Sequence, residues 1–159
     1  MAKPLDGIRV LDLTQLLPGP NCTGILADLG TEVIKVGPRG GDFGRLLGGM
    51  FSQVNRGKKS ITLDLKTEAG KELYRELVRD ADVVIEAMRP GVLAKLGLGF
   101  EDLRKVNPAI VFCTVSGYGM TGPYKDMPSH GIAYDTWSGA VTPAYDEEGF
   151  CYIPEHVSI

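Results

Sequence analysis

Residues 8–36 read IRVLDLTQLLPGPNCTGILADLGTEVIKV, and this stretch decides the fold. Its first part, residues 8–13, is a short apolar run of the kind found in buried parallel strands. Its last part, residues 31–36, is rich in β-branched residues and predicts a second strand. The segment between them has the length and composition of a helix. The stretch therefore predicts a strand–helix–strand unit.

The ends of this first helix are set by residues with special backbone preferences. The sequence Pro18-Gly19-Pro20 breaks the chain after the first strand. Either Asn21 or Thr23 can then cap the helix with its side-chain oxygen. The helix is expected to reach Leu29, because Gly30 follows and glycine readily takes the left-handed conformation that ends helices.

The same alternation of strand and helix continues along the chain. Further strands are predicted over residues 60–65, 82–86 and 109–115. Helices are predicted after the cap Thr67 as far as Val78, from Pro90 as a first helical residue, and over residues 100–106. Repeated units of this kind predict an α/β protein with a parallel sheet and helices on both faces.

Two segments lack such a pattern. Residues 37–49 hold six glycines in thirteen positions, which predicts a loop or a ligand contact. Residues 143–155 are polar, aromatic and irregular, as expected for a connecting segment. We therefore predict one domain over residues 1–140 and an irregular connection over residues 141–159.

Composition excludes several functional classes. The 159 residues carry 17 basic and 20 acidic side chains, a net charge of −3, so no broad positive field favours nucleic acid or a membrane surface. Three cysteines without paired spacing predict neither a disulfide framework nor a zinc site. No apolar run approaches the roughly 20 residues of a membrane span. We expect a cytoplasmic protein without a metal.

Ligands of open parallel sheets bind beyond the carboxyl ends of the strands. The predicted site walls are therefore the loops that follow Leu13, Val36, Glu86 and Val115. The glycines at 40 and 41 in the second of these loops resemble a phosphate loop only loosely. They serve equally well to permit an ordinary turn.

Cations near these loops are candidates for binding phosphate. Lys58 lies in a basic turn before the third strand, and a solvated turn is an equally good interpretation. Arg89 lies just after the fourth strand, with Lys95 one or two helical turns further along. The alternative for Arg89 is an ion pair with the nearby Glu86.

Two further features could take part in chemistry. Gly117, Tyr118 and Gly119 lie in a glycine-dense segment whose N–H groups can approach an anion closely. His130 is one of two histidines and can move a proton at a carbon acid, although a lone histidine is more often structural.

Together these segments resemble the family III coenzyme A transferases, a group that also includes the α-methylacyl-CoA racemases. The resemblance covers nearly the whole chain in order and spacing. It is carried by Leu5–Leu13, Pro18–Pro20, Gly30–Val36, Asn55–Lys66, Ala81–Glu86, Arg89–Leu93 and Gly117–Pro123.

The resemblance implies that residues 1–140 are the N-terminal portion of a Rossmann-like, CoA-binding large domain. It also implies that the chain is the N-terminal part of a larger two-domain fold in which two chains interlock. In the transferases an aspartate attacks the acyl-CoA and forms a mixed anhydride, and CoA is then passed to an acceptor acid. The implied ligands are an acyl-CoA thioester, as substrate rather than as a tightly bound cofactor, and a carboxylic acid. Lys58, Arg89 and Lys95 would hold the nucleotide, and Gly117, Tyr118 and Gly119 would border the thioester. The catalytic aspartate is expected just past Ile159.

The family also leaves alternatives open. In a racemase His130 would be an acid/base group, but the aspartate that follows that histidine in racemases is Gly131 here. A third possibility is a non-catalytic CoA-binding or assembly subunit that is active only with a partner chain. Whichever alternative holds, we expect a homodimer or a complex with a paralogous subunit. Gly37 and the run Glu86-Ala87-Met88 depart from common family residues and bear on acyl specificity. A dinucleotide oxidoreductase is disfavoured because no glycine fingerprint follows the first strand.

Overall fold

The computed structural model describes residues 2–128 and 131–154. It contains two compact units, residues 1–116 and 117–159, and each is described here by itself. The domain boundary predicted at residue 140 falls inside the second unit, between α6 (Gly131–Trp137) and β6 (Ala144–Tyr145). The division at residue 140 stays a prediction.

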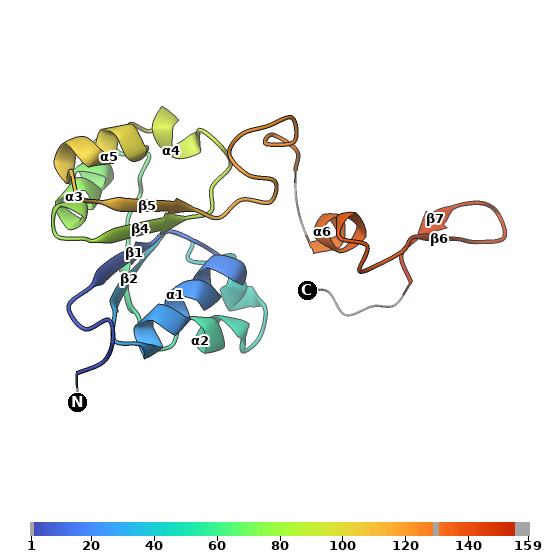
Figure 1. The fold of residues 1–159 in the computed structure, drawn as a ribbon, viewed down its shortest axis with the longest axis horizontal. Helices are drawn as coiled ribbons and strands as arrows, with labels where there is room; N and C mark the ends of the chain where they lie inside the picture. Colours follow the sequence, from blue (N-terminus) through green and yellow to red (C-terminus); the bar gives the residue numbers. More distant parts are fainter. Residues whose placement is uncertain (1, 129–130, 155–159) are drawn as a thin grey trace. The chain divides into compact units, whose positions relative to one another are not determined.

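The first unit is built on a five-stranded parallel sheet (Figure 1). Its strands are β1 (Arg9–Asp12), β2 (Glu32–Gly37), β3 (Lys59–Thr62), β4 (Val83–Glu86) and β5 (Val111–Thr114). They lie in the order β3-β2-β1-β4-β5, and every neighbouring pair is parallel. All five predicted strands are therefore confirmed, as is the α/β class.

Helices cover both faces of this sheet. They are α1 (Pro18–Asp28), α2 (Met50–Val54), α3 (Glu68–Arg79), α4 (Val92–Lys95) and α5 (Phe100–Val106), together with the short 3₁₀ helix η1 (Phe43–Leu46). In Figure 1, α1 and α2 lie on one side of the strands and α3, α4 and α5 on the other. No helix in the described part of the chain is long and apolar enough to cross a bilayer.

Alternation along the strands divides the core between the two faces. Leu11 and Leu13 belong to the larger cluster, which also contains Tyr74 and Val78 of α3 and Leu103 of α5. Val10 and Val33 belong to the smaller cluster, against which Leu26 of α1 packs. Successive strand residues point to opposite faces, so residues 10 and 12 of β1 share the α1 face. Asp12 thus lies on the apolar α1 side of the sheet, and it is fully buried there.

Helix α1 begins earlier than the sequence predicted. Pro18 is its first residue, and neither Asn21 nor Thr23 is its cap. Proline is tolerated in a first helical turn, because the N–H groups there have no partner within the helix. The predicted end of the helix is confirmed, since Gly30 follows it with φ +110°.

Two other predictions for the first unit need correction. Pro90 does not open a helix, because α4 starts at Val92 after Gly91, whose φ is +80°. Residues 37–49 are not entirely loop, because η1 forms within them. The predicted cap Thr67 is confirmed, and its Oγ1 accepts the N–H of Gly70 at 3.1 Å.

The second unit is small. It contains α6 and a hairpin in which β6 pairs antiparallel with β7 (Cys151–Tyr152). The prediction of an irregular segment from residue 143 was therefore wrong where these two short strands form. Asp146 closes the turn between them, because its Oδ1 accepts the N–H groups of Glu148 and Phe150.

Candidate functional site at the strand switch point

The strand order places a switch point between β1 and β4. The chain runs from β1 outward to β2 and β3, then returns to the other side of β1 with β4 and β5. In open α/β sheets, the crevice at the carboxyl ends of two such strands is where ligands bind. Its walls here are the loops over residues 13–17 and 87–91. The N–H of Leu13 donates to the carbonyl of Ile85 at 2.8 Å, which ties the two strands together at this end.

The loop after β1 contains an unusual backbone conformation. Leu16 has φ +64° and is the one non-glycine residue with positive φ in the described part of the chain. A side chain with a Cβ in this region costs about 1–3 kcal/mol, so the surrounding structure must impose it. The N–H of Leu16 donates to Oδ1 of Asp42 at 3.2 Å. Such strained residues cluster at functional sites.

Beneath this loop lies a buried carboxylate. Asp12 Oδ1 accepts the N–H of Thr14 at 2.9 Å and its hydroxyl at 2.5 Å. Asp12 Oδ2 accepts the Thr23 hydroxyl at 2.6 Å and Lys58 Nζ at 3.0 Å. Lys35 Nζ lies 3.8 Å from the same oxygen. Asp12 therefore joins β1 to α1, β2 and the turn before β3.

A second buried carboxylate extends this network toward the loop. Lys35 Nζ lies 3.1 Å from Asp42 Oδ2 and donates to the carbonyl of Thr14 at 2.7 Å. The side chains of Lys35 and Asp42 are 4% and 2% exposed. Asp42 Oδ1 also accepts the N–H of Gly44 at 2.8 Å, which starts η1. We call Asp12, Lys35, Asp42 and Lys58 the buried charge network. Its two cations and two anions are formally neutral in sum.

The environment of this network shifts two of its pKa values. Burial alone would raise the pKa of Asp12, but Lys35, the hydroxyls of Thr14 and Thr23, and Lys58 together hold it below its ordinary value. Burial lowers the pKa of Lys58, and the attraction of Asp12 only partly offsets this. The carboxyl group of Asp12 is therefore ionised at neutral pH.

The structure assigns Lys58 to this network. Its side chain is 1% exposed, and Nζ contacts Asp12 Oδ2, Thr23 Oγ1, the Pro20 carbonyl and Asn55 Oδ1 within 3.0 Å. An ammonium has three protons, so these oxygens already saturate it. The predicted role of Lys58 in holding the nucleotide remains a prediction, and it would require these contacts to open.

The loop after β4 presents a different kind of cation. Glu86 is buried and accepts the N–H of Met88 through Oε2 at 2.7 Å. Arg89 is exposed, and among the described residues it forms no ion pair with Glu86 or with any other acid. The alternative interpretation of Arg89 as the partner of Glu86 thus has no support. Lys95, the last residue of α4, is exposed as well.

Two cations that the sequence interpretation missed share these properties. Arg39 follows β2 and Lys66 follows β3, and both are exposed. Neither forms an ion pair with an acid in the described part of the chain. Their positions just after parallel strands were the available signal. Together with Arg89 they give the carboxyl edge several unpaired positive charges, which suits a ligand with phosphates.

The remaining predicted site residues belong to the second unit or fall outside the description. Gly117 and Gly119 are exposed, and Gly119 has φ +84°. Tyr118 packs edge-on against Trp137, with ring centroids 6.2 Å apart, and lies 6.5 Å from the Tyr124 ring. His130 lies outside the described residues. In the part of the chain that is described, no three acidic, histidine or cysteine side chains gather as metal ligands would.

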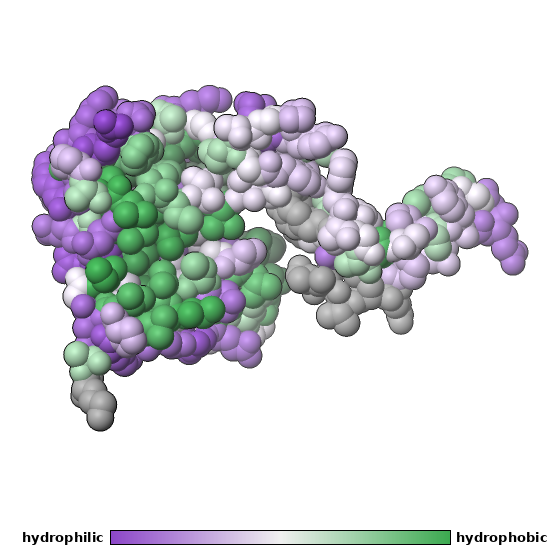
Figure 2. Space-filling model, in the orientation of Figure 1, coloured by the Kyte–Doolittle hydropathy of each residue, from purple (hydrophilic) through white to green (hydrophobic). Residues whose placement is uncertain are grey.

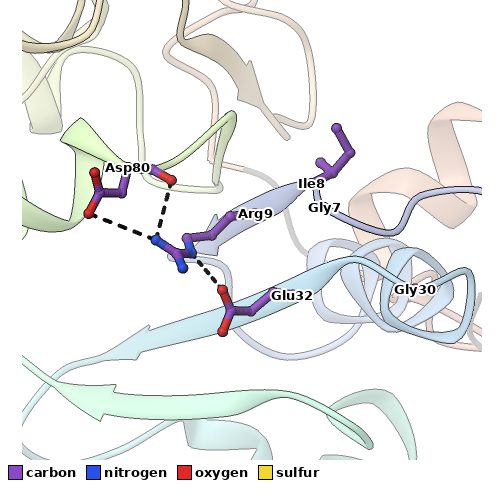
Figure 3. Close-up of a pocket in the computed structure, with 6 residues that line it drawn as sticks. All are labelled: Gly7, Ile8, Arg9, Gly30, Glu32 and Asp80. Carbon is purple, nitrogen blue, oxygen red and sulfur yellow. Dashed lines mark hydrogen bonds and ion pairs between the residues drawn. The ribbon is translucent and has the colours of Figure 1, made fainter.

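A shallow hollow of about 450 Å³ lies at the opposite, amino edge of the sheet (Figure 3). Arg9 crosses it, donating from Nε to Glu32 Oε2 at 2.6 Å and approaching Asp80 Oδ2 at 3.9 Å. The hydrogen bond to Glu32 is the main reason that the pKa of Arg9 is raised. Lys59 and then Arg9 lower the pKa of Glu32. The charged side chains that line this hollow are already paired with one another. They therefore attract an anionic ligand less than the unpaired cations at the carboxyl edge do.

These features define an α/β protein with exposed cations at the carboxyl edge of its parallel sheet, and its similarity to known proteins identifies its family. The model of CoA-transferase family III matches residues 5–153, and the chain belongs to this family.

Individual relatives agree with this assignment. The chain is 44% identical over 155 residues to acetyl-CoA:oxalate CoA-transferase of Acetobacter aceti, covering 92% of this chain and 39% of that protein. It is 42% identical over 161 residues to succinate–glutarate CoA-transferase of Agrobacterium fabrum, covering 92% and 40%. A CaiB/BaiF family protein from Brucella suis has a solved structure with a TM-score of 0.89 and 36% identity, covering 100% of this chain and 44% of that one. The chain thus spans about two fifths of the length of these relatives.

Proposed function

We propose that this chain supplies the acyl-CoA-binding part of a CoA-transferase, which moves CoA from an acyl-CoA thioester to a carboxylic acid. The observation that carries the proposal is the family match over residues 5–153. The names of two curated relatives pair acetyl-CoA with oxalate and succinate with glutarate, so the acyl groups and acids named for those proteins are small carboxylic acids or their CoA thioesters.

The exposed cations give this proposal a physical basis. Coenzyme A carries a diphosphate and a ribose phosphate, and its nucleotide end would lie against Arg89, Lys95, Arg39 and Lys66. Arg89 is the strongest candidate because it lies in the loop beside the switch point and has no acidic partner among the described residues. A guanidinium can bind two phosphate oxygens at once. Gly117, Tyr118 and Gly119 would border the thioester.

The chemistry that the family implies is nucleophilic catalysis by a carboxylate. An aspartate attacks the thioester carbonyl, forming an acyl–aspartyl anhydride and releasing CoA as a thiolate. The thiolate then attacks the aspartyl carbonyl of this anhydride, which gives an aspartyl-CoA thioester and releases the donor carboxylate. The acceptor carboxylate attacks that thioester, giving an acceptor–aspartyl anhydride and free thiolate. The thiolate finally attacks the acceptor carbonyl, which gives the new acyl-CoA and frees the aspartate. We assign this aspartate to no residue of the present chain. Asp12 and Asp42 are unsuited to the role, because both are buried and engaged with lysines.

Binding of coenzyme A to the full-length protein tests the proposal. Arg89→Ala is expected to weaken CoA binding in calorimetry by about 1–3 kcal/mol, the range for loss of a charged hydrogen bond. The matched control is Arg104→Ala, which removes an exposed arginine from α5 that pairs with Glu101 at 3.5 Å. Unchanged affinity in Arg89→Ala would remove Arg89 from the site.

A trapping experiment separates the transferase from the racemase. With an acyl-CoA, hydroxylamine is expected to intercept the anhydride of a transferase. Exchange of deuterium into the α carbon without an acceptor acid would instead favour a racemase with His130 as acid/base. Binding of CoA without either reaction would favour a non-catalytic subunit. We also propose a dimer of identical or paralogous chains, which light scattering of the purified protein tests.

A further inference from the structure

We propose that Asp42 is a positioning residue, which holds the loop at residues 14–17 in its strained conformation and so shapes the wall of the acyl-CoA site at the switch point. This inference rests on the proposed function, because it assigns the loop to that site. Asp42 contacts no substrate in this view. It acts through the backbone of Leu16, whose N–H it accepts at 3.2 Å.

The strain at Leu16 is the first support for this inference. A leucine left to itself would move away from φ +64°, because its Cβ crowds the backbone there. The loop has no glycine at this position to relieve the crowding. Something must therefore hold it, and the contact from Asp42 is a hydrogen bond to the strained residue itself.

The way in which Asp42 is itself fixed is the second support. Its Oδ1 accepts from both Leu16 and Gly44, and its Oδ2 lies 3.1 Å from Lys35 Nζ. Lys35 in turn donates to the carbonyl of Thr14 at 2.7 Å, so the loop is held at its start and at its strained residue. The carboxylate is thus aimed by three fixed groups and has little freedom to release the loop.

Position in the sheet is the third support. The loop follows β1, the central strand, and lies on one side of the switch point, while the loop with Arg89 lies on the other. Gly19 at the start of α1 approaches Thr14 so closely that a Cβ there would lie 2.3 Å from Thr14 Cβ. A shift of the loop would therefore also displace the first turn of α1. Asp42 is one residue through which the binding wall can be perturbed without removing any group from it.

Two substitutions of Asp42 separate positioning from simple stabilisation. Asp42→Asn keeps an oxygen that can accept from Leu16 and Gly44, but loses the charge that faces Lys35. Asp42→Ser also loses the charge and can still cap Gly44, but it is too short to reach Leu16. Both variants are expected to be less stable toward urea by similar amounts. Only Asp42→Ser should release the loop.

Affinity of the full-length protein for free coenzyme A is the decisive measurement. Asp42→Ser is expected to raise the Kd about tenfold or more, and Asp42→Asn to stay within about threefold of wild type. In a Leu16→Gly background the Kd for coenzyme A should no longer depend on Asp42, because glycine adopts positive φ without strain. Asp42→Ser combined with Leu16→Gly is therefore expected to return the Kd to within about threefold of Leu16→Gly alone.

Each failure has a distinct meaning. Asp42→Asn and Asp42→Ser could weaken CoA binding equally, or Leu16→Gly could fail to restore CoA binding to Asp42→Ser. Either result would overturn the positioning role while leaving the proposed function intact. A wild-type protein that does not bind CoA would overturn the proposed function and this inference with it. If Asp42→Ser does not fold, hydrogen exchange of the wild type tests the same contact. A Leu16 amide that exchanges as fast as an unprotected one would overturn the inference.

Discussion

Asp12 and Lys35 face each other in register across β1 and β2, at positions where a buried parallel sheet ordinarily has apolar side chains. Removing one charge from such a buried network leaves another uncompensated. Asp12→Asn is therefore expected to lower the free energy of unfolding at pH 7 by about 3 kcal/mol or more, measured by urea denaturation. The control Asp28→Asn, which breaks an exposed pair with Arg56, should cost less than about 1 kcal/mol.

Asp12→Asn should also make the free energy of unfolding depend less on pH in the acidic range. The pKa of Asp12 is lower in the folded chain than its ordinary value of 3.8, so the folded state binds that proton less readily than the unfolded state. Its contribution is fully present above the unfolded-state pKa and is lost as pH falls through the folded one. Wild type should lose stability steeply below about pH 5, and Asp12→Asn less steeply. Parallel profiles would show that Asp12 is not the group responsible.

Gly19 has a steric reason to be glycine. Its φ is not in the left-handed region, yet an added Cβ would lie 2.3 Å from Thr14 Cβ, and Thr14 is held by Asp12. Gly19→Ala is expected to reduce stability by about 1–3 kcal/mol through overpacking. Gly40→Ala is the matched control, because nothing lies within 4 Å of a Cβ there. Equal stability of the two variants in urea would show that the first turn of α1 can move aside.

At the scale of single elements, α3 is the helix whose beginning the sequence describes best. Thr67 Oγ1 accepts from Gly70, and loss of such a cap typically costs about 1 kcal/mol. Thr67→Ala should therefore lower the midpoint of thermal unfolding, while Thr67→Ser should retain most of the stability. A serine variant as unstable as the alanine variant would mean that the threonine methyl group, rather than its hydroxyl, matters.

The elements that the sequence predicts well are those set by local periodicity. The β-branched and apolar runs predicted all five strands, and the spacing of apolar residues predicted α3 and α5. The beginning of α1 could not be predicted in the same way. Asn21 and Thr23 have capping side chains, but Thr23 instead donates its hydroxyl to Asp12, a residue of another element. A partner that tertiary structure brings into contact overrides a local preference.

The first unit as a whole leaves part of its apolar surface exposed. Figure 2 shows hydrophobic residues gathered over the strands and α1 on the face seen in Figure 1. Val111 on β5, an edge strand of the sheet, is 58% exposed. Val111→Thr has nearly the same shape and is expected to reduce binding of the dye ANS without a large change in stability. Val78→Thr, at a fully buried site, should instead destabilise by about 1–3 kcal/mol.

Dye binding that is unchanged in Val111→Thr would show that β5 is not part of the accessible apolar surface. A large loss of stability in the same variant would contradict the exposure of this residue in the structure.

The candidate site could be predicted only in part from the sequence. Arg89 was found because a cation just after a strand must lie at the carboxyl edge of a parallel sheet. Nothing in the sequence singles out Asp42, which follows the glycines at 40 and 41. Its contact with Leu16 spans 26 positions and depends on a backbone angle that no pattern of leucines reveals. Lys58 resembled a surface cation because its acceptors, Asp12 and Thr23, are distant in sequence.

The position of β1 in the middle of the sheet has a consequence for synthesis on the ribosome. Of the five strands of this sheet, β1 is synthesised first, yet its two neighbours are β2 and β4, and the second of these ends at Glu86. One side of β1 therefore stays open while about seventy further residues are translated. Non-local parallel pairing of this kind is slow to form, because the entropic cost of closing a long loop comes before the stabilising contacts are made. A nascent chain that pauses before β4 would expose an unpaired edge to chaperones and to other chains.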